Sequence, residues 1–142
     1  MVRRGFRSDS GMEVPLTALS LNVYEASFLS EKEYAFSAVE EGRPPQIYLT
    51  DGMHANAPLS LGESRYPALS PDGRWMAYSH LEDGMWNLWV RDQRTGSTRR
   101  LAEVPCNQIQ PSWEDGSKTL LYGTDCGRSL WFTAVARRPV VP

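Results

Sequence analysis

The feature that most restricts the fold of this chain is a pattern that its sequence contains three times. Three segments share this pattern: EASFLSEKEYAFSA, PALSPDGRWMAYSH and PSWEDGSKTLLYGT. Each has an aromatic residue 11 positions after its first residue, namely Phe36, Tyr78 and Tyr122. A second motif follows each segment, as QIYLTD, NLWVRD and SLWFTA, and the repeat length is 41 to 44 residues. A repeat of this length determines the architecture, so it takes precedence over local assignments.

Each repeat predicts a unit of short strands joined by tight turns. The stretches APLSLG and STRRLA supply a fourth strand to the first two units, and the predicted units are 23–62, 63–104 and 105–136. Pro71, Asp72 and Gly73 fit a type I turn, because proline fixes φ at its first central position and glycine accepts a positive φ. Asp115 and Gly116 stand at the same place in the third unit.

The apolar residues in these strands do not alternate with polar ones. Residues 75–78, 88–90 and 130–132 are apolar at consecutive positions. A sheet with one face in water would alternate, so these sheets are predicted to be covered on both faces. Four-stranded antiparallel sheets that repeat about every 40 to 45 residues are typical of β-propeller blades. The sequence therefore predicts an all-β chain of three four-stranded antiparallel blades.

Length and charge restrict the function classes. A chain of 142 residues is expected to form one domain, and its net charge of −2 argues against a nucleic-acid-binding protein. No apolar run approaches the roughly 18 residues of a membrane helix. The arginines near the start are not followed by an apolar segment, so no export signal is visible, and residues 1–11 are predicted to be a flexible tail.

The second unit also resembles a known family. Residues 66–102 contain P-x-x-S-P-D-G-x-x-x-A-Y-S followed by L-W-V-x-D-x-x-T-G-x-x-R-x-L, which is similar to the WD-like repeat of TolB-type six-bladed propellers and of propeller domains in prolyl-oligopeptidase-like enzymes. The match is weaker in 107–135, and weakest in 23–62, where Leu29, Ser30 and Glu31 replace Pro-Asp-Gly. The resemblance implies a binding platform without catalytic residues. It also implies a periplasmic location, although the chain lacks the separate N-terminal domain of TolB.

The number of repeats raises the question of how the ring closes. Three blades are too few, since familiar propellers have about four to eight. The third unit has little room for a fourth strand, whereas residues 12–22 have the pattern of an unpaired outer strand. Residues 13–19 of each chain are expected to complete the third blade of a second chain, giving a six-bladed homodimer. Alternatively, the sequence is the C-terminal half of a longer six-bladed protein, or an excised piece of one.

Two cysteines are predicted to form a disulfide. If the third hairpin is centred on residues 115–117, position i faces position 232 − i, so Cys106 faces Cys126. Directly opposed residues have Cα atoms about 4.5 to 5.5 Å apart, which a disulfide accepts. Such a bridge would indicate an oxidising compartment, periplasmic or extracellular. The alternative is a pair of free thiols, and a metal site is not expected because two thiols alone are a poor ligand set.

No catalytic constellation is recognisable. His54 and His80 lack the partners of a triad, and Ser70 and Ser79 lack the G-x-S-x-G context of an exposed nucleophile. Asp72 and Asp115 are interpreted as turn formers. Asp125 and Arg128 flank Cys126, and a contact between them is expected to lock the following loop. No cofactor is expected.

Propeller geometry indicates where a ligand would bind. The first residues of the inner strands face the central channel, and they are Tyr24, Arg65, Tyr66, Asn107, Gln108 and Gln110. This polar and aromatic mouth suits peptides or protein loops. The sequence thus favours a non-enzymatic, self-associating scaffold that binds proteins or peptides; the alternative is the propeller half of a larger oligopeptidase-like hydrolase or sensor that gates or presents substrate.

Overall fold

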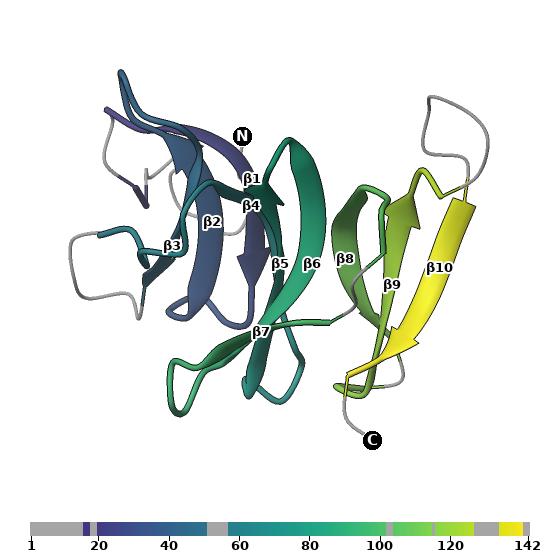
Figure 1. Ribbon diagram of the computed structural model, residues 1–142. Helices are drawn as coiled ribbons and strands as arrows, with labels where there is room; N and C mark the ends of the chain where they lie inside the picture. The colour runs from purple at the N-terminus through teal and green to yellow at the C-terminus, as the bar shows by residue number, and fades with distance from the viewer. Residues whose placement is uncertain are drawn as a thin grey trace.

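The chain folds into three antiparallel sheets that follow one another in sequence order (Figure 1). The computed structural model describes residues 16–17, 20–50, 57–101, 104–114, 116–126 and 134–140, which contain ten strands and no helix. Blade 1 consists of β1 (Asn22–Phe28), β2 (Tyr34–Val39) and β3 (Gln46–Thr50). Blade 2 consists of β4 (Ser64–Leu69), β5 (Trp75–Glu82), β6 (Met85–Asp92) and β7 (Thr98–Arg100). Blade 3 consists of β8 (Gln108–Glu114), β9 (Thr119–Thr124) and β10 (Ala134–Pro139).

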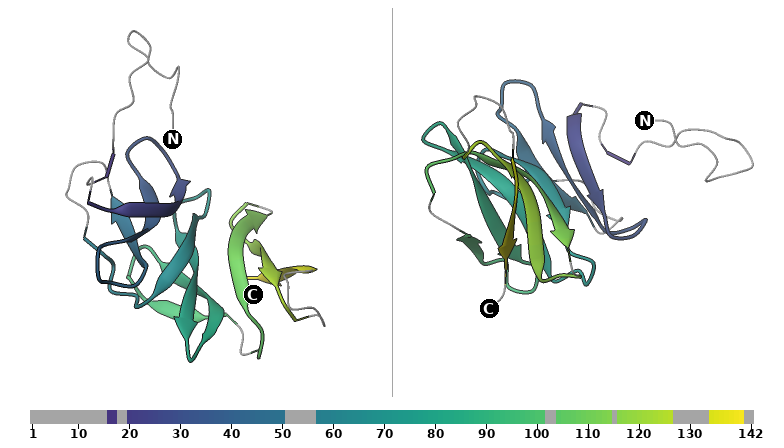
Figure 2. Two further views of the ribbon diagram at one scale, coloured as in Figure 1. Left: turned by 90° about the horizontal axis from the view of Figure 1, so that it is seen from above. Right: turned by 90° about the vertical axis from the view of Figure 1, so that its right-hand side faces the viewer.

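The first strand of each blade is its inner strand. The strand orders are β1-β2-β3, β4-β5-β6-β7 and β8-β9-β10, and β4 contacts both β1 and β8. Figure 2 shows the sheets following one another from the purple and blue blade 1 to the green and yellow blade 3. This arrangement is that of successive propeller blades, so the all-β propeller prediction is confirmed.

Within the described residues, blade 2 is the one sheet with four strands. In blade 1 the fourth strand is reduced to a single bridge between Tyr48 and Pro58. In blade 3 the described residues form three strands, and the third begins at Ala134, the last residue of the SLWFTA segment. Ala134 pairs with Thr124, whereas residues 127–133 lie outside the described part of the chain.

The predicted outer strand 12–22 was expected to pair with a second chain, so it stays a prediction, and most of this segment lies outside the described residues. Residues 16–17 and 20–21 are not in a strand, and β1 begins at Asn22. The hydroxyl of Tyr34 donates to the carbonyl of Leu16 at 3.2 Å, which holds this segment on the outward face of its own blade.

The Ser-Pro-Asp-Gly segment forms the predicted hairpin turn. The amide of Gly73 donates to the Ser70 carbonyl at 2.9 Å, and Gly73 has φ +74°. The buried Ser70 hydroxyl donates to Asp72 Oδ1 at 2.7 Å and accepts from the Trp75 amide at 2.9 Å. The Ser70 hydroxyl and the Asp72 carboxylate of this turn therefore both have structural partners.

The core consists of the contacts between successive blades. Met76 and Tyr78 of β5 pack with Ala35 and Ile47 of blade 1 across a contact that we call junction 1. Side chains on the other face of blade 2 pack against blade 3 across junction 2, in a cluster of Ala68, Ala77, Leu88, Val90, Leu120, Tyr122 and Val140. Because neighbouring residues of a strand point to opposite faces, a fully apolar run such as 75–78 serves both junctions.

Candidate functional site

The inner strands share an irregularity at the end where they begin, which we call the bulge end. The pairing register of each inner strand with its neighbour shifts by one at Tyr24, at Tyr66 and Pro67, and at Gln110 and Pro111. Tyr66 and Gln110 have positive φ values of 59° and 54°. Residues other than glycine rarely adopt this conformation, which costs about 1 to 3 kcal/mol and is concentrated at functional sites.

One carboxylate holds the bulges of blades 1 and 2 together. Glu25 Oε2 accepts from Nε and Nη2 of Arg65 at 3.2 and 2.5 Å. Its Oε1 accepts from the Tyr66 amide at 3.0 Å and from the Ser37 hydroxyl. Glu25 therefore fixes the strained Tyr66 backbone and neutralises Arg65 at the same time.

The guanidinium of Arg65 lies between two tyrosine rings. Its Cζ is 4.3 Å from the ring centre of Tyr24 and 4.8 Å from that of Tyr66. Tyr66 in turn makes an edge contact with Trp86 at 6.4 Å. Tyr24 is 49% exposed, so the cluster presents an ordered aromatic surface to solvent.

Asn107 and Gln108 lie inside junction 2, and only Gln110 of the blade 3 candidates is exposed. The side-chain oxygen of Asn107 accepts from the Trp86 amide at 2.9 Å, and that of Gln108 accepts from the Leu88 amide at 3.0 Å. Gln108 is 1% exposed. Ligand access to Gln108 is therefore blocked, because its side chain completes the hydrogen bonding of β6 inside the core.

The structure contains the predicted disulfide next to these residues. Cys106 and Cys126 have Cα atoms 5.1 Å apart. Asp125 accepts from the backbone and side-chain nitrogens of Asn107, both at 2.7 Å. The expected contact of Asp125 with Arg128 lies outside the described residues and stays a prediction. Asp125 orients Asn107 toward β6.

The sequence interpretation missed Glu25 and Trp86 as members of the bulge-end cluster. Glu25 stands where the other two repeats have Pro67 and Pro111. This replacement of a repeated proline by a carboxylate could have identified Glu25 from the sequence. Trp86 had no such signal, because its ring contact with Tyr66 joins β6 to β4 across the intervening strand β5.

The described residues contain no group of three side chains that could hold a metal ion. Nδ1 of His80 lies 3.0 Å from the Glu63 carbonyl, and the ring makes an edge contact with Trp89. The Ser79 hydroxyl is buried and donates to the Gln108 carbonyl at 2.9 Å. His54 and Asp115 lie outside the described residues.

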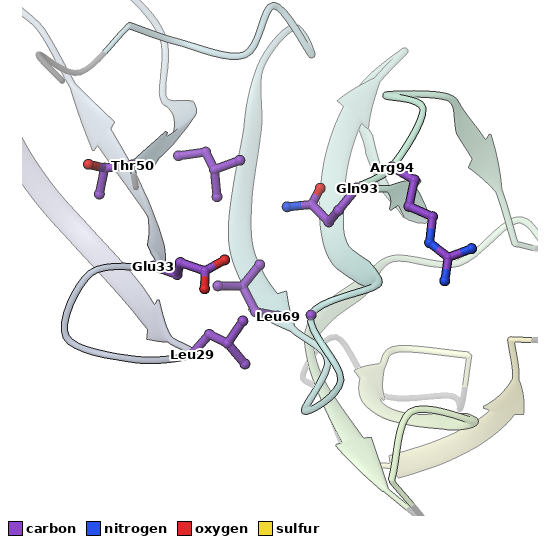
Figure 3. Close-up of a pocket in the computed structure, with 8 residues that line it drawn as sticks. Leu29, Glu33, Thr50, Leu69, Gln93 and Arg94 are labelled. Atoms are coloured by element: carbon purple, nitrogen blue, oxygen red, sulfur yellow. The ribbon is translucent and has the colours of Figure 1, made fainter. Parts of the chain in front are cut away.

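A hollow of about 440 Å³ lies at the opposite end, where the inner strands end (Figure 3). Its lining comes from the turns of blades 1 and 2 and the end of β3: Leu29, Glu33, Leu49, Thr50, Leu69, Gly73, Gln93 and Arg94. Arg94 extends away from the leucines, so the polar groups do not converge on one point (Figure 3). Small-molecule sites usually combine an apolar cavity with convergent polar groups. The bulge end is therefore the better candidate.

No helix within the described residues is long and apolar enough to cross a membrane.

No family model matches the sequence. Two curated proteins described as "Protein TolB homolog" are similar to it: one from Chlorobaculum tepidum is 33% identical over 84 residues, or 54% of this chain, and one from Chlorobium chlorochromatii is 41% identical over 49 residues, or 34% of this chain. These matches cover 18% and 11% of the two proteins, so the chain spans a small part of their length.

Solved structures with the same fold include TolB proteins and propeller domains of enzymes. A putative TolB from Agrobacterium tumefaciens matches with a TM-score of 0.59 and 20% identity over 66% of this chain and 34% of that one. TolB from Acinetobacter baumannii matches with 0.59 and 23%, over 73% and 27%. The β-propeller domain of the Trilobed protease from Pyrococcus furiosus matches with 0.60 and 18%, over 75% and 34%. At this identity the structural matches establish the fold.

Proposed function

Because the chain is built of TolB-type β-propeller blades, we propose that it is a non-enzymatic scaffold that binds a peptide or protein segment at the bulge end. The observation that supports this function is the Arg65 guanidinium held between Tyr24 and Tyr66 and neutralised by Glu25. Tyrosine, tryptophan and arginine are enriched in protein-binding surfaces, and the two aromatic side chains supply large contact areas at a low entropic cost.

Peptide-library selection combined with NMR tests this function. A random 12-residue peptide library displayed on phage is selected on the oxidised wild-type chain, and retained peptides are titrated into ¹⁵N-labelled protein. We expect shifts at Tyr24, Tyr66 and Trp86, and at least about a tenfold loss of affinity in Tyr24→Ala. The control is Arg94→Ala, which removes an exposed side chain at the opposite end of the inner strands. Peptides that shift only residues at the opposite end would refute this assignment.

The disulfide supports a location in an oxidising compartment, such as the periplasm. Structural disulfides persist in the periplasm and outside the cell and are rare in the cytosol. Labelling of thiols in freshly lysed source cells tests this part of the proposal, which predicts that Cys106 and Cys126 are protected until a reductant is added.

The proposed scaffold associates with a second copy of itself by strand exchange. In blade 2 the outer strand β7 pairs with β6, whereas β10 is the last strand of the third sheet in the described residues. Residues 13–19 of a second chain would supply the missing outer strand. The mass of the chain in solution measures this association directly.

A second candidate function is the propeller part of a larger hydrolase. Acylaminoacyl peptidase structures match 72% of this chain with TM-scores of 0.56 to 0.58, which places the same fold within peptidases. The coding sequence beyond Pro142 discriminates between the candidates. An in-frame domain with its own nucleophile would favour the hydrolase, and a stop codon would favour the scaffold.

A further inference from the structure

The outward face of blade 1, which points away from blade 2, carries a row of aromatic rings. The ring centres of Phe28 and Tyr34 are 5.1 Å apart, those of Tyr34 and Phe36 are 6.3 Å apart, and those of Phe36 and Tyr48 are 5.1 Å apart and stacked. We call these four residues the aromatic face. Such a surface on one side of a thin sheet needs a covering layer.

The repeat shows what kind of layer this position usually receives. Phe36 is equivalent to Tyr78 and Tyr122 in the sequence repeat. Tyr78 packs against blade 1 and Tyr122 packs against blade 2, so each of these rings points to the blade that precedes its own. By the same rule Phe36 points to a blade before blade 1, and this chain has none among its described residues.

The chain covers this face with its own N-terminal segment. Leu21 packs against the aromatic cluster, and the Tyr34 hydroxyl donates to the Leu16 carbonyl at 3.2 Å. Phe36 is 1% exposed, but Phe28 remains 60% exposed and Leu16 52% exposed. Four large apolar residues are exposed in the described part of the chain, and all belong to this segment or to β1: Leu16, Val23, Tyr24 and Phe28. The cover is therefore incomplete.

The counterpart of this face lies at the other end of the chain. Leu120 faces junction 2, so its neighbour Leu121 faces away from blade 2, together with Ser112 and the ion pair of Glu114 with Arg137. Leu121 is equivalent in the repeat to Ala35, which packs against blade 2 in junction 1. The outward face of blade 3 is thus equivalent to the face of blade 1 that packs against Tyr78 of blade 2. In each case the next blade would contribute its aromatic side to the contact.

We propose that the aromatic face of blade 1 is the docking surface for the outward face of blade 3 from a second copy of this chain. The proposal rests on the self-association stated above and adds the two surfaces that meet. Two chains related by a two-fold axis form the contact twice and close a ring of six blades, which leaves neither face exposed. The segment around Leu16 competes with the second copy for the aromatic face, and it leaves that face when it adds to the edge of the partner's β10.

The solution mass of the oxidised chain, measured by light scattering over a range of concentrations, is the first test. We expect a species of twice the 16.0 kDa of one chain. Phe28→Asp and Leu121→Asp each place a charge in the contact and are expected to weaken the dimer at least about tenfold. Ser97→Asp adds the same charge in an exposed turn of blade 2 and should leave the dimer intact. Circular dichroism melting shows that each variant is folded.

Mixing the two weakened variants tests the pairing of the faces. In a mixed dimer one contact carries both substitutions and the other carries neither, so the mixture should dimerise more strongly than either variant alone. Tyr34→Phe removes the hydrogen bond to Leu16 and should strengthen the dimer by about two- to tenfold, because it weakens the competing segment.

The possible failures are distinguishable. A monomer at every concentration overturns both this inference and the proposed self-association. Peptide binding at the bulge end is tested separately, by the NMR titration. A dimer that is insensitive to Phe28→Asp and Leu121→Asp overturns the docking surfaces and leaves strand exchange intact. A weaker dimer in Tyr34→Phe overturns the competition by the N-terminal segment.

Discussion

Junctions 1 and 2 join successive copies of one repeat, yet they differ in the chemistry at the bulge end. Junction 1 is held there by an ion pair between Glu25 and Arg65, whose side chains are 22% and 29% exposed. Junction 2 has neutral amides in the same place, with Asn107 and Gln108 bonded to backbone amides of β6. Salt screens a partly exposed ion pair far more than a buried neutral hydrogen bond. The two junctions therefore share a backbone geometry, but the stability of junction 1 should depend on salt concentration and that of junction 2 should not.

The largest effect is expected from the apolar part of junction 2. Leu120→Ala should lower the free energy of unfolding by about 2 to 5 kcal/mol, because Leu120 is fully buried and its loss leaves a cavity. Urea denaturation measures the change. Leu121→Ala is the matched control when both variants are measured at a concentration at which the chain is monomeric, since the neighbouring side chain lies outside the junction, and its cost should be clearly smaller. Equal costs would show that blade 3 does not depend on packing against blade 2.

The disulfide should contribute the second largest effect, confined to junction 2. Replacing Cys106 and Cys126 by serine together should cost about 3 kcal/mol, the chain-entropy value for a loop with a sequence separation of 20. Reduced wild-type protein should have the same stability as the double variant. Hydrogen exchange should accelerate at the Trp86 and Leu88 amides and stay unchanged at the Tyr66 amide. Faster exchange at Tyr66 would mean that the two junctions open together.

A smaller effect is expected from the ion pair of junction 1. Glu25→Gln removes one charge and should cost about 0.5 to 1 kcal/mol at low salt, the range of partly exposed pairs. The difference from wild type should shrink as sodium chloride is raised to about 1 M. Gln108→Glu introduces a charge at junction 2 and is the reciprocal variant. If the Glu25→Gln cost persists in high salt, the carboxylate acts through its hydrogen bonds to Tyr66 and Ser37 instead.

The smallest effect is expected in acid and comes from a pair inside blade 2. Arg74 donates to both carboxylate oxygens of Asp92 at 3.1 and 3.0 Å and lowers the pKa of Asp92 to about 2. Since the unfolded pKa is about 3.9, the stabilisation is present above that pH and is lost as pH falls toward 2. The slope of stability against pH should flatten in Asp92→Asn. Because this pair crosses neither junction, hydrogen exchange at Tyr66 and at Trp86 should respond equally.

The repeat made most of the fold predictable from sequence. Strand count and order in blade 2, the turn at Pro71 and the pairing of Cys106 with Cys126 all follow from hydrophobic pattern and turn chemistry. The predicted pairing of the cysteines is correct, although the structure departs from the assumed hairpin register in two ways that cancel. The third turn connects Glu114 with Thr119, so its centre lies half a residue later than assumed, and the bulge at Gln110 restores the assumed register beyond it.

The candidate site was only partly predictable. Topology identified the bulge end, and the structure brings Tyr24, Arg65 and Tyr66 together there. Sequence could not separate these residues from Gln108, because whether a strand-start side chain reaches the channel or the junction depends on the register shift at each bulge. Glu25 was missed because its partners are 40 and 41 residues away in the sequence.

The bulge of β8 also decides whether the chain can be oxidised correctly. Near the turn, paired positions sum to 233, and beyond the bulge they sum to 232, as Gln108 with Thr124 shows. Without the bulge Cys106 would stand opposite Gly127, and the two thiols would point to opposite faces of the sheet. Formation of the bond therefore records that the strands have aligned properly. In an oxidising compartment the bond then locks this alignment of β8 and β9 in place.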